Sequence, residues 1–313
     1  MPGLKIAVQM DAMPGIDISG DSTFALMLEA QARGHALWHY EVAHMWLEGT
    51  SLYARAHPLR VQNVVGTHYE FGPERVLELA EMQVVLMRQD PPFDMAYITA
   101  THLLEHIHPK TLVVNHPAAV RNAPEKLLVT HFPELMPPTL IARDRGAIAD
   151  FRARHSDIIV KPLFGNGGVG VFRLRPEDEN LGSLLEMFFA ASREPVMVQR
   201  YEPAVRAGDK RIILVDGVPL GAVNRVPAAG DSRSNMHAGG RAERATLSAR
   251  EHEICEAIGP LLRREGLLFT GIDVIGDYLT EINVTSPTGL QQIARFDGVN
   301  LAAAIWDKIE LMR

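Results

Sequence analysis

The chain has 313 residues, and 47% of them are hydrophobic, which is enough for two or more domains with large cores. Its 38 acidic residues outnumber its 31 basic residues, and no run of lysine or arginine stands out. The net charge of −7 therefore argues against a nucleic-acid partner. The single cysteine, Cys255, excludes an internal disulfide bond, and its apolar neighbours at helical spacing indicate a position in the core.

The N-terminal segment MPGLKIAVQMD has one lysine and an apolar stretch that is too short for a secretory signal. No apolar run along the chain reaches the ~20 residues that are needed to span a bilayer. We therefore expect a cytoplasmic protein that has no membrane partner.

The first third of the chain alternates patterns that are typical of strands and helices. Residues 4–10 are a continuous apolar run, as in a strand that is buried on both faces. The helical pattern that follows has Asp21 or Ser22 as its N-cap and stops at Gly34, and residues 36–42 form the next strand pattern. The later expected elements are an antiparallel excursion at 52–64, helices at 74–82 and 95–108, and strands at 83–92 and 111–117.

This alternation predicts an open, mostly parallel α/β sheet with helices on both faces, which we assign to a first domain of residues 1–124. Sheets of this kind bind ligands at the carboxyl ends of their strands. The polar residues at those ends are Asp11, Arg88, Asp90 and Asn115. The alternative is that the last three only form turns beside prolines.

The character of the chain changes after residue 124. A helical pattern at 126–132 is interrupted by prolines at 133, 137 and 138. Antiparallel strands with helices on one side, an α+β arrangement, are then expected in a lobe of residues 125–202 and a second lobe of residues 203–313. Their expected elements are helices at 147–156, 180–192, 247–266 and 298–313, strands at 157–163, 171–175 and 194–203, and hairpins at 210–226 and 271–284.

The segment KPLFGNGGVGVFR, residues 161–173, is the clearest local signal of a ligand site. Glycines let the backbone approach a phosphate closely and point several N–H groups at it. The loop lacks the Lys-Ser/Thr ending of a P-loop, and a strand follows it where a dinucleotide-binding motif has a helix. We therefore expect a β-hairpin flap over phosphates, with Lys161 beside it, although tight turns also use glycine.

Two further segments have polar residues at strand ends. The segment VMVQRYEP, residues 196–203, offers a strand edge that can bind a nucleotide base, or it is a linker between lobes. Strand alternation places Asp209 and Arg211 on one face and Lys210 on the other, and Arg225 ends the partner strand. Ordinary surface charges are the alternative for these four residues.

The hairpin GIDVIGDYLTEINV, residues 271–284, has three polar residues in an apolar setting. Alternation puts Glu281 and Asn283 on one face, and Asp273 lies near Glu281 across the short turn. Two carboxylates and an amide form an all-oxygen donor set that suits Mg²⁺. The alternative is a solvated face with ion pairs to lysine or arginine, although an amide adds nothing to a charge ladder.

These segments together resemble the ATP-grasp ligases, in which a first α/β domain precedes a two-lobed α+β domain. More narrowly, RQDPPFD, NAPEKL, DIIVKPL, GDKRIILVDG, RSNMHAGG and GIDVIGDYLTEINVTSPTG resemble segments of bacterial glutathione synthetases, in order and nearly end to end. The resemblance implies an ATP-dependent ligase that joins γ-glutamylcysteine and glycine through an acyl phosphate. It also implies a homotetramer and two Mg²⁺ ions, for which Mn²⁺ can substitute.

The resemblance also implies roles for individual residues. Asp273, Glu281 and Asn283 would hold the metal ions, and Arg211, Arg225 and Arg233 would act in catalysis. Arg233 belongs to a lid expected at 227–241. The nucleotide would contact Lys126, Lys161, Gly165, Asn166, Gly167, Gly168, Gln199, Arg200, Tyr201, Glu202 and Asp209. The other substrates would contact Asp11, Arg88, Asp90, Ser286, Thr288 and Gly289.

Two other functions fit parts of this pattern. The first is another carboxylate–amine ligase, similar to D-alanine–D-alanine ligases or to peptide-tailoring enzymes of the same fold. The second is a nucleotide-binding regulator that has lost catalysis. A regulator predicts a broken metal set or missing arginines, and both sets are intact in this sequence.

Overall fold

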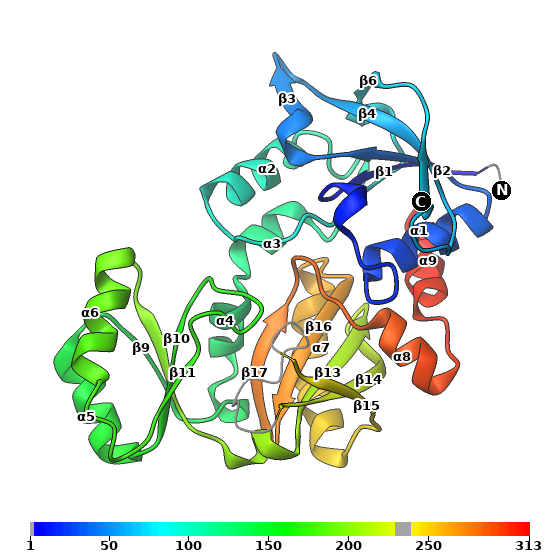
Figure 1. The fold of residues 1–313 in the computed structure, drawn as a ribbon. Coiled ribbons are helices and arrows are strands. Elements are labelled where there is room, and N and C mark those ends of the chain that lie inside the picture. The colour runs from blue at the N-terminus through cyan, green and yellow to red at the C-terminus, as the bar shows by residue number, and fades with distance from the viewer. Residues whose placement is uncertain (1–2, 229–238) are drawn as a thin grey trace.

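The computed structural model describes residues 3–228 and 239–313. Arg233 and most of the expected lid at 227–241 lie outside these residues. The described chain is built around three sheets (Figure 1). In the two described stretches, no helix is long and apolar enough to cross a membrane.

The first sheet confirms the predicted parallel α/β arrangement. Strand β1 lies between β2 and β7, β8 pairs with β7, and all three pairings are parallel. Helix α1 begins after Asp21, whose side chain accepts a hydrogen bond from the backbone N–H of Phe24. The elements are β1 (Lys5–Gln9), α1 (Ser22–Ala32), β2 (Ala36–Tyr40), β7 (Val84–Met87), α2 (Met95–Glu105), β8 (Leu112–Val114) and α3 (Pro117–Asn122).

An antiparallel extension widens this sheet, as expected for the segment at 52–64. Strand β4 (Ser51–Val61) pairs with β2 and also with β3 (Met45–Glu48), β5 (Tyr69–Phe71) and β6 (Arg75–Glu78). The predicted helix at 74–82 is wrong, because its first half is β6 and Leu79–Glu81 is a 3-10 turn. Strand β4 has eleven residues and is longer than β2. β6 pairs with the part of β4 that does not pair with β2, and it satisfies the backbone hydrogen-bonding groups there.

The second sheet is antiparallel and has the order β11-β10-β12-β9. Helices α5 and α6 pack on it, and Ile148, Phe151 and Leu185 join the buried side chains of its strands in a separate core. Figure 1 shows this lobe in green, apart from the first sheet. Its elements are β9 (Thr139–Ala142), α5 (Arg145–His155), β10 (Ile158–Pro162), β11 (Phe172–Leu174), α6 (Leu181–Ala191) and β12 (Val196–Arg200).

The third sheet is also antiparallel and has the order β15-β14-β13-β16-β17. The predicted hairpin turn at Asp216 and Gly217 is present, and both residues have positive φ angles, 51° and 68°. Helix α7 packs against this sheet through Ile254, Cys255 and Ile258. The elements are β13 (Asp209–Val215), β14 (Val218–Val226), β15 (Arg241–Arg244), α7 (Ala249–Arg264), β16 (Phe269–Ile275) and β17 (Tyr278–Asn283).

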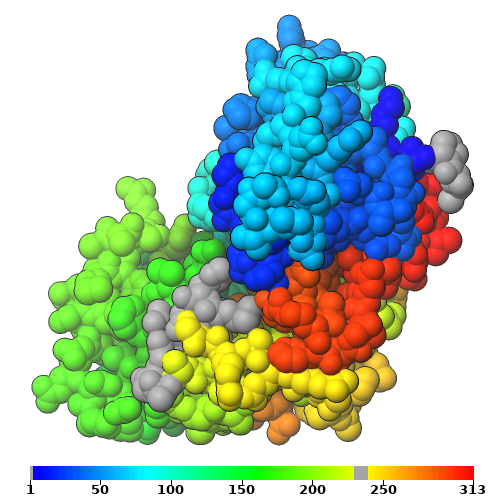
Figure 2. Space-filling view, turned by 45° about the vertical axis from the view of Figure 1, so that its right-hand side comes forward, coloured from blue at the N-terminus to red at the C-terminus, as the bar shows by residue number. Residues whose placement is uncertain are grey.

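The remaining helices connect the three sheets. Helix α4 (Glu125–Leu128) follows the first sheet and packs beside β17. Helix α8 (Leu290–Asp297), which periodicity did not predict, follows β17. Helix α9 (Leu301–Leu311) returns to the first sheet, where Trp306 lies in a core with residues of α1. The red end of the chain accordingly packs against the blue N-terminal residues (Figure 2).

Asn115 ties the first sheet to the third. Its amide nitrogen donates hydrogen bonds to the backbone oxygens of Phe269 and Val284, both at 2.8 Å. Its amide oxygen accepts a hydrogen bond from the N–H of Phe269 at 2.8 Å. The side chain is buried, so Asn115 holds the sheets together and does not face a ligand cleft.

Candidate active site

A cleft opens between the second and third sheets, beside the glycine-rich flap. Strands β10, β12, β13, β16 and β17 and helix α4 all contribute to its walls. Every residue that we predicted to contact a nucleotide lines it. These residues are Lys126, Lys161, Gly165, Asn166, Gly167, Gly168, Gln199, Arg200, Tyr201, Glu202 and Asp209.

The flap is the predicted β-hairpin, because β10 and β11 pair antiparallel on either side of it. Gly167 and Gly168 have φ angles of 62° and 79°, in the left-handed region that favours glycine. Lys126 Nζ donates a hydrogen bond to the backbone oxygen of Gly165 at 2.5 Å. Helix α4 therefore anchors the base of the flap.

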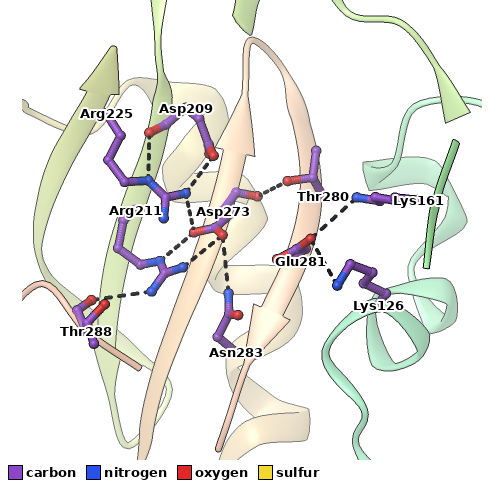
Figure 3. A network of polar contacts seen from close by, with 10 residues as sticks. All are labelled: Lys126, Lys161, Asp209, Arg211, Arg225, Asp273, Thr280, Glu281, Asn283 and Thr288. Atoms are coloured by element: carbon purple, nitrogen blue, oxygen red, sulfur yellow. Dashed lines mark hydrogen bonds and ion pairs between the residues drawn. The ribbon is translucent and has the colours of Figure 1, made fainter. Parts of the chain in front are cut away.

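Two lysines and one glutamate form the charged centre of this cleft (Figure 3). Lys161 Nζ lies 3.5 Å from Glu281 Oε1, and Lys126 Nζ lies 3.6 Å from the same oxygen. Burial lowers the pKa of Lys161, and the charge of Glu281 opposes this effect. Burial by itself would raise the pKa of Glu281, but the two lysines hold it below the ordinary value. The charged forms of Lys161 and Glu281 therefore stabilise each other, and the charge of Lys126 also stabilises the charged form of Glu281.

A second network joins two arginines to two aspartates on neighbouring strands (Figure 3). Arg211 on β13 contacts both oxygens of Asp273 on β16, with Nε to Oδ1 at 2.5 Å and Nη2 to Oδ2 at 2.9 Å. Arg225 Nη2 lies 2.6 Å from Asp209 Oδ2 and 3.0 Å from Asp273 Oδ1. All four residues are less than 9% exposed, so the pairs are shielded from water. Lys210 lies on the opposite face and pairs with Glu251, as alternation predicts.

The hairpin of β16 and β17 brings the predicted metal-binding residues together. Asp273 lies opposite Glu281, and Gly271 lies opposite Asn283. Asn283 Nδ2 lies 3.4 Å from Asp273 Oδ2. No group of three or more His, Cys, Asp or Glu side chains that could hold a metal ion occurs in the described stretches. The predicted metal-binding set comprises two carboxylates and one amide, and in this structure its carboxylates form the ion pairs that we considered as the alternative.

A second cleft adjoins the first, and Asn166, Gly167 and Glu281 line both. Arg211 and Arg225 line this second cleft. Four of the six residues that we predicted to contact the other substrates also line it, namely Asp90, Ser286, Thr288 and Gly289.

The other two, Asp11 and Arg88, line neither cleft and instead support residues that do. Asp11 Oδ2 accepts a hydrogen bond from the N–H of Asp90 at 2.8 Å. Arg88 is buried, and its Nη2 donates to the backbone oxygen of Pro287 at 3.0 Å. In this structure both residues shape the wall of the second cleft.

Side chains along the expected base-binding edge have partners of their own. Gln199 Nε2 donates to Thr139 Oγ1 at 2.9 Å, and Arg200 Nη2 donates to the hydroxyl of Tyr278 at 3.1 Å. The guanidinium of Arg173 lies 3.6 Å from the ring centre of Tyr201. These contacts orient the side chains at the edge of the first cleft.

Sequence patterns missed three polar residues that line the second cleft, Glu125, Thr285 and Gln292. Glu125 lies next to Lys126 in sequence, and Thr285 and Gln292 flank the turn that contains Ser286 and Thr288. Their positions depend on how α4 and α8 pack, which periodicity does not report. Proximity to recognised motifs was the only available signal for them.

Comparison with family models gives two adjoining matches. Residues 4–121 match the N-terminal domain of prokaryotic glutathione synthetase, and residues 125–298 match its ATP-grasp domain. The chain belongs to the prokaryotic glutathione synthetase family. This membership confirms the resemblance that we drew from the motifs and the fold that it implied.

Relatives within the prokaryotic glutathione synthetase family match the chain over its whole length. The glutathione synthetase of Brucella melitensis is 59% identical over 310 residues, which cover 99% of each chain. That of Yersinia pestis is 42% identical over 310 residues, which cover 98% of this chain and 97% of the relative.

More distant solved structures have the same fold as this prokaryotic glutathione synthetase family member. D-cycloserine synthetase DcsG has a TM-score of 0.67 at 16% identity and covers 97% of this chain and 99% of its own. The ATP-grasp ligase PsnB, complexed with a minimal precursor, Mg and ADP, has a TM-score of 0.62 at 17% identity and covers 98% of this chain and 97% of its own.

Proposed function

We propose that this chain joins γ-glutamyl-L-cysteine to glycine, forms glutathione and converts ATP to ADP and phosphate. Full-length relatives at 56% to 59% identity that are named glutathione synthetase support this activity. The observation that carries the site assignment is the junction of the two clefts at Glu281 and the flap. One cleft has the charges and glycines that suit a nucleotide, and the other has the arginines and turn residues that suit small amino acids.

ATP occupies the first cleft in this proposal. Lys126 and Lys161 neutralise its phosphates, and the backbone N–H groups of Gly167 and Gly168 close over them. The base lies along residues 199–202, in an edge that offers both backbone and side-chain groups. Asp209 lies at the end of the same cleft and contacts the ribose.

Asp273, Glu281 and Asn283 bind two Mg²⁺ ions in this proposal, and Mn²⁺ can substitute for them. The residues fit such ions, because they form an all-oxygen set where the two clefts adjoin: Asp273 lines the first cleft, Asn283 lines the second, and Glu281 lines both. When bound, the ions neutralise the phosphates during transfer of the γ-phosphate to the cysteinyl carboxylate. Asp273 would then share its oxygens between a metal ion and the two arginines.

Arg211 and Arg225 stabilise the acyl phosphate and the oxyanion that forms when the glycine amine attacks it. Their place at the wall of the second cleft, beside Asp273, supports this role. Arg233 and the lid at 227–241 would exclude water from the acyl phosphate, and Arg233 and most of this lid lie outside the described residues.

The γ-glutamylcysteine and glycine occupy the second cleft. Ser286, Thr288 and Gly289 present hydroxyl and backbone groups to substrate carboxylates, and Asp90 lies on the wall near them. Asp11 and Arg88 act on these substrates by positioning Asp90 and Pro287.

We also propose that the protein acts as a homotetramer in the cytoplasm, with small molecules as its substrates and with neither nucleic acid nor a membrane as a partner. The family resemblance supports the tetramer, and the charge balance supports the absence of nucleic acid. Light scattering after size exclusion tests the tetramer, and a mass of one chain would contradict it.

Phosphate release from ATP with γ-glutamylcysteine and a series of amines tests the activity. We expect release with glycine and formation of glutathione in equal amount. Release with D-alanine but not with glycine would favour a different carboxylate–amine ligase. No release with any amine would favour a regulator without catalysis.

A further inference from the structure

Glu125 occupies a position in the second cleft that the roles proposed above do not explain. It is the first residue of α4 and directly precedes Lys126. Its Oε1 accepts a hydrogen bond from Thr285 Oγ1 at 2.9 Å, next to the turn at Ser286. The carboxylate is therefore held by a neutral partner on the wall of the substrate cleft.

The negative charge of Glu125 is not balanced by an ion pair in the part of the chain that the structure describes. Glu281, another acidic residue of this cleft, has two lysine partners within 4 Å, and Asp90 has interactions of its own. Among the residues that the structure describes, none forms an ion pair with Glu125. Burial raises the pKa of Glu125 and the charge of Glu281 raises it further, whereas the charges of Lys126 and Arg211 and the hydrogen bond from Thr285 only partly oppose these effects. A cation that entered the cleft beside Glu125 would compensate the negative charge of this side chain.

The proposed substrates bring two ammonium groups into this cleft, one on glycine and one on the glutamyl residue. The glycine ammonium loses a proton, and its nitrogen then forms a bond to the cysteinyl carboxyl carbon as the carbon–oxygen bond to the phosphate breaks and phosphate leaves. This nitrogen must therefore lie beside the transferred phosphate. The glutamyl ammonium is separated from that carbon by the whole γ-glutamyl chain. Glu125 lines a small pocket together with Asn166 of the flap, which lines both clefts, so Glu125 lies toward the end of the second cleft where glycine reacts.

We propose that Glu125 binds the ammonium group of the incoming glycine and holds its nitrogen beside the acyl phosphate. This role rests on the proposed function and adds the residue that recognises the amine. Thr285 orients the carboxylate through the hydrogen bond that its hydroxyl donates to Oε1. An amine substrate without a positive charge would gain nothing from this contact.

The substitution Glu125→Gln tests the proposal because it removes the charge and keeps the shape. We expect the KM for glycine to rise about 10- to 100-fold, since one partner of a charged pair is lost in a shielded site. The KM values for ATP and γ-glutamylcysteine should stay within about twofold, because neither is bound through this charge. Glu125→Asp keeps the charge and should recover part of the loss.

A second assay of the proposal uses hydroxylamine in place of glycine, because hydroxylamine is a neutral nucleophile near neutral pH and traps acyl phosphates. Hydroxamate formation should have the same rate in the wild type and in Glu125→Gln. Glu134→Gln, which alters an exposed carboxylate, is the matched control and should leave all constants unchanged.

Three outcomes would overturn the proposal. The first is a KM increase for γ-glutamylcysteine in place of glycine, which would assign Glu125 to the glutamyl ammonium. The second is an equal loss of rate with glycine and hydroxylamine, and the third is an unchanged KM for glycine. If Glu125→Gln does not fold, the same comparison is made with Glu125→Asp. Failure of the wild type to use glycine would refute the proposed function itself and is seen in the first assay.

Discussion

Arg211 donates hydrogen bonds to both carboxylate oxygens of Asp273 on the neighbouring strand, at 2.5 Å and 2.9 Å. The two residues are directly opposite each other in the register of β13 and β16. The pair is buried, and Arg225 adds a third contact at 3.0 Å. The same contacts that hold this sheet together therefore also set the positions of proposed metal-binding and catalytic groups.

The substitution Arg211→Met should both destabilise the protein and abolish turnover. It leaves Asp273 buried with only Arg225 as a cation, and breaking a buried pair costs about 3 kcal/mol or more. The double variant Arg211→Met/Asp273→Leu should recover much of the stability and none of the activity. Urea unfolding and phosphate release measure the two effects. A single variant as stable as the wild type would show that the pair contributes little to folding.

The substitution Glu281→Gln should reduce turnover by roughly 10²–10³-fold while the protein remains folded, since it removes a charge proposed to hold the metal ions. Lys126 and Lys161 would still approach the phosphates. Glu243→Gln is a suitable control, because Glu243 pairs with Arg241 at the surface. Phosphate release at saturating Mg²⁺ measures the effect, and near-normal turnover would show that the metal assignment is wrong.

The stability contributed by Asp273 should depend on pH in the acidic range. Burial by itself would raise its pKa, but the charges of Arg211 and Arg225 hold the pKa below the ordinary value of 3.8. A carboxyl group whose pKa is lower in the folded chain stabilises the fold above its unfolded pKa, and this contribution disappears as the pH falls through the folded pKa.

Asp273→Asn should therefore be less stable than the wild type near neutral pH, and the difference should shrink as the pH falls below about 4. Urea midpoints at a series of pH values measure this difference. A constant difference over the whole range would contradict the charged state of Asp273.

Cys255 should be unreactive in the folded protein. Burial raises the pKa of its thiol to about 12, and the charges of Glu251 and Glu256 add to the effect. Only ~10⁻⁴ of the thiol would be ionised near pH 8, and the side chain of Cys255 on α7 is fully buried in the core. Labelling with iodoacetamide should need denaturant, whereas rapid labelling of the native protein would contradict the core position.

Local pattern predicted the elements well where hydrophobic periodicity coincided with a turn or cap signal. The hairpins around Asp216 and after Asp273 formed as expected, because two-residue turns set the strand register. The helix expected at 74–82 became a strand because β4 offered an unpaired edge from elsewhere in the chain. Helix α8 was missed because it follows a turn rich in proline and threonine with no cap signal.

The sequence by itself determined the family motifs, the glycine flap and the shared face of Asp273, Glu281 and Asn283. These depend on short-range geometry, in which glycine permits positive φ angles and strand alternation sets the direction of each side chain. Sequence patterns could also nominate Lys126 and Lys161, although the two are far apart along the chain.

Only the tertiary structure determined which charged side chains contact one another. It placed Glu281 near two lysines and Arg211 on Asp273, and it buried Arg88 against the turn that contains Pro287. It also brought Glu125 to the wall of the second cleft. Each of these contacts joins residues from different sheets, strands or helices, and their distances depend on how those elements pack, which no local pattern in the chain encodes.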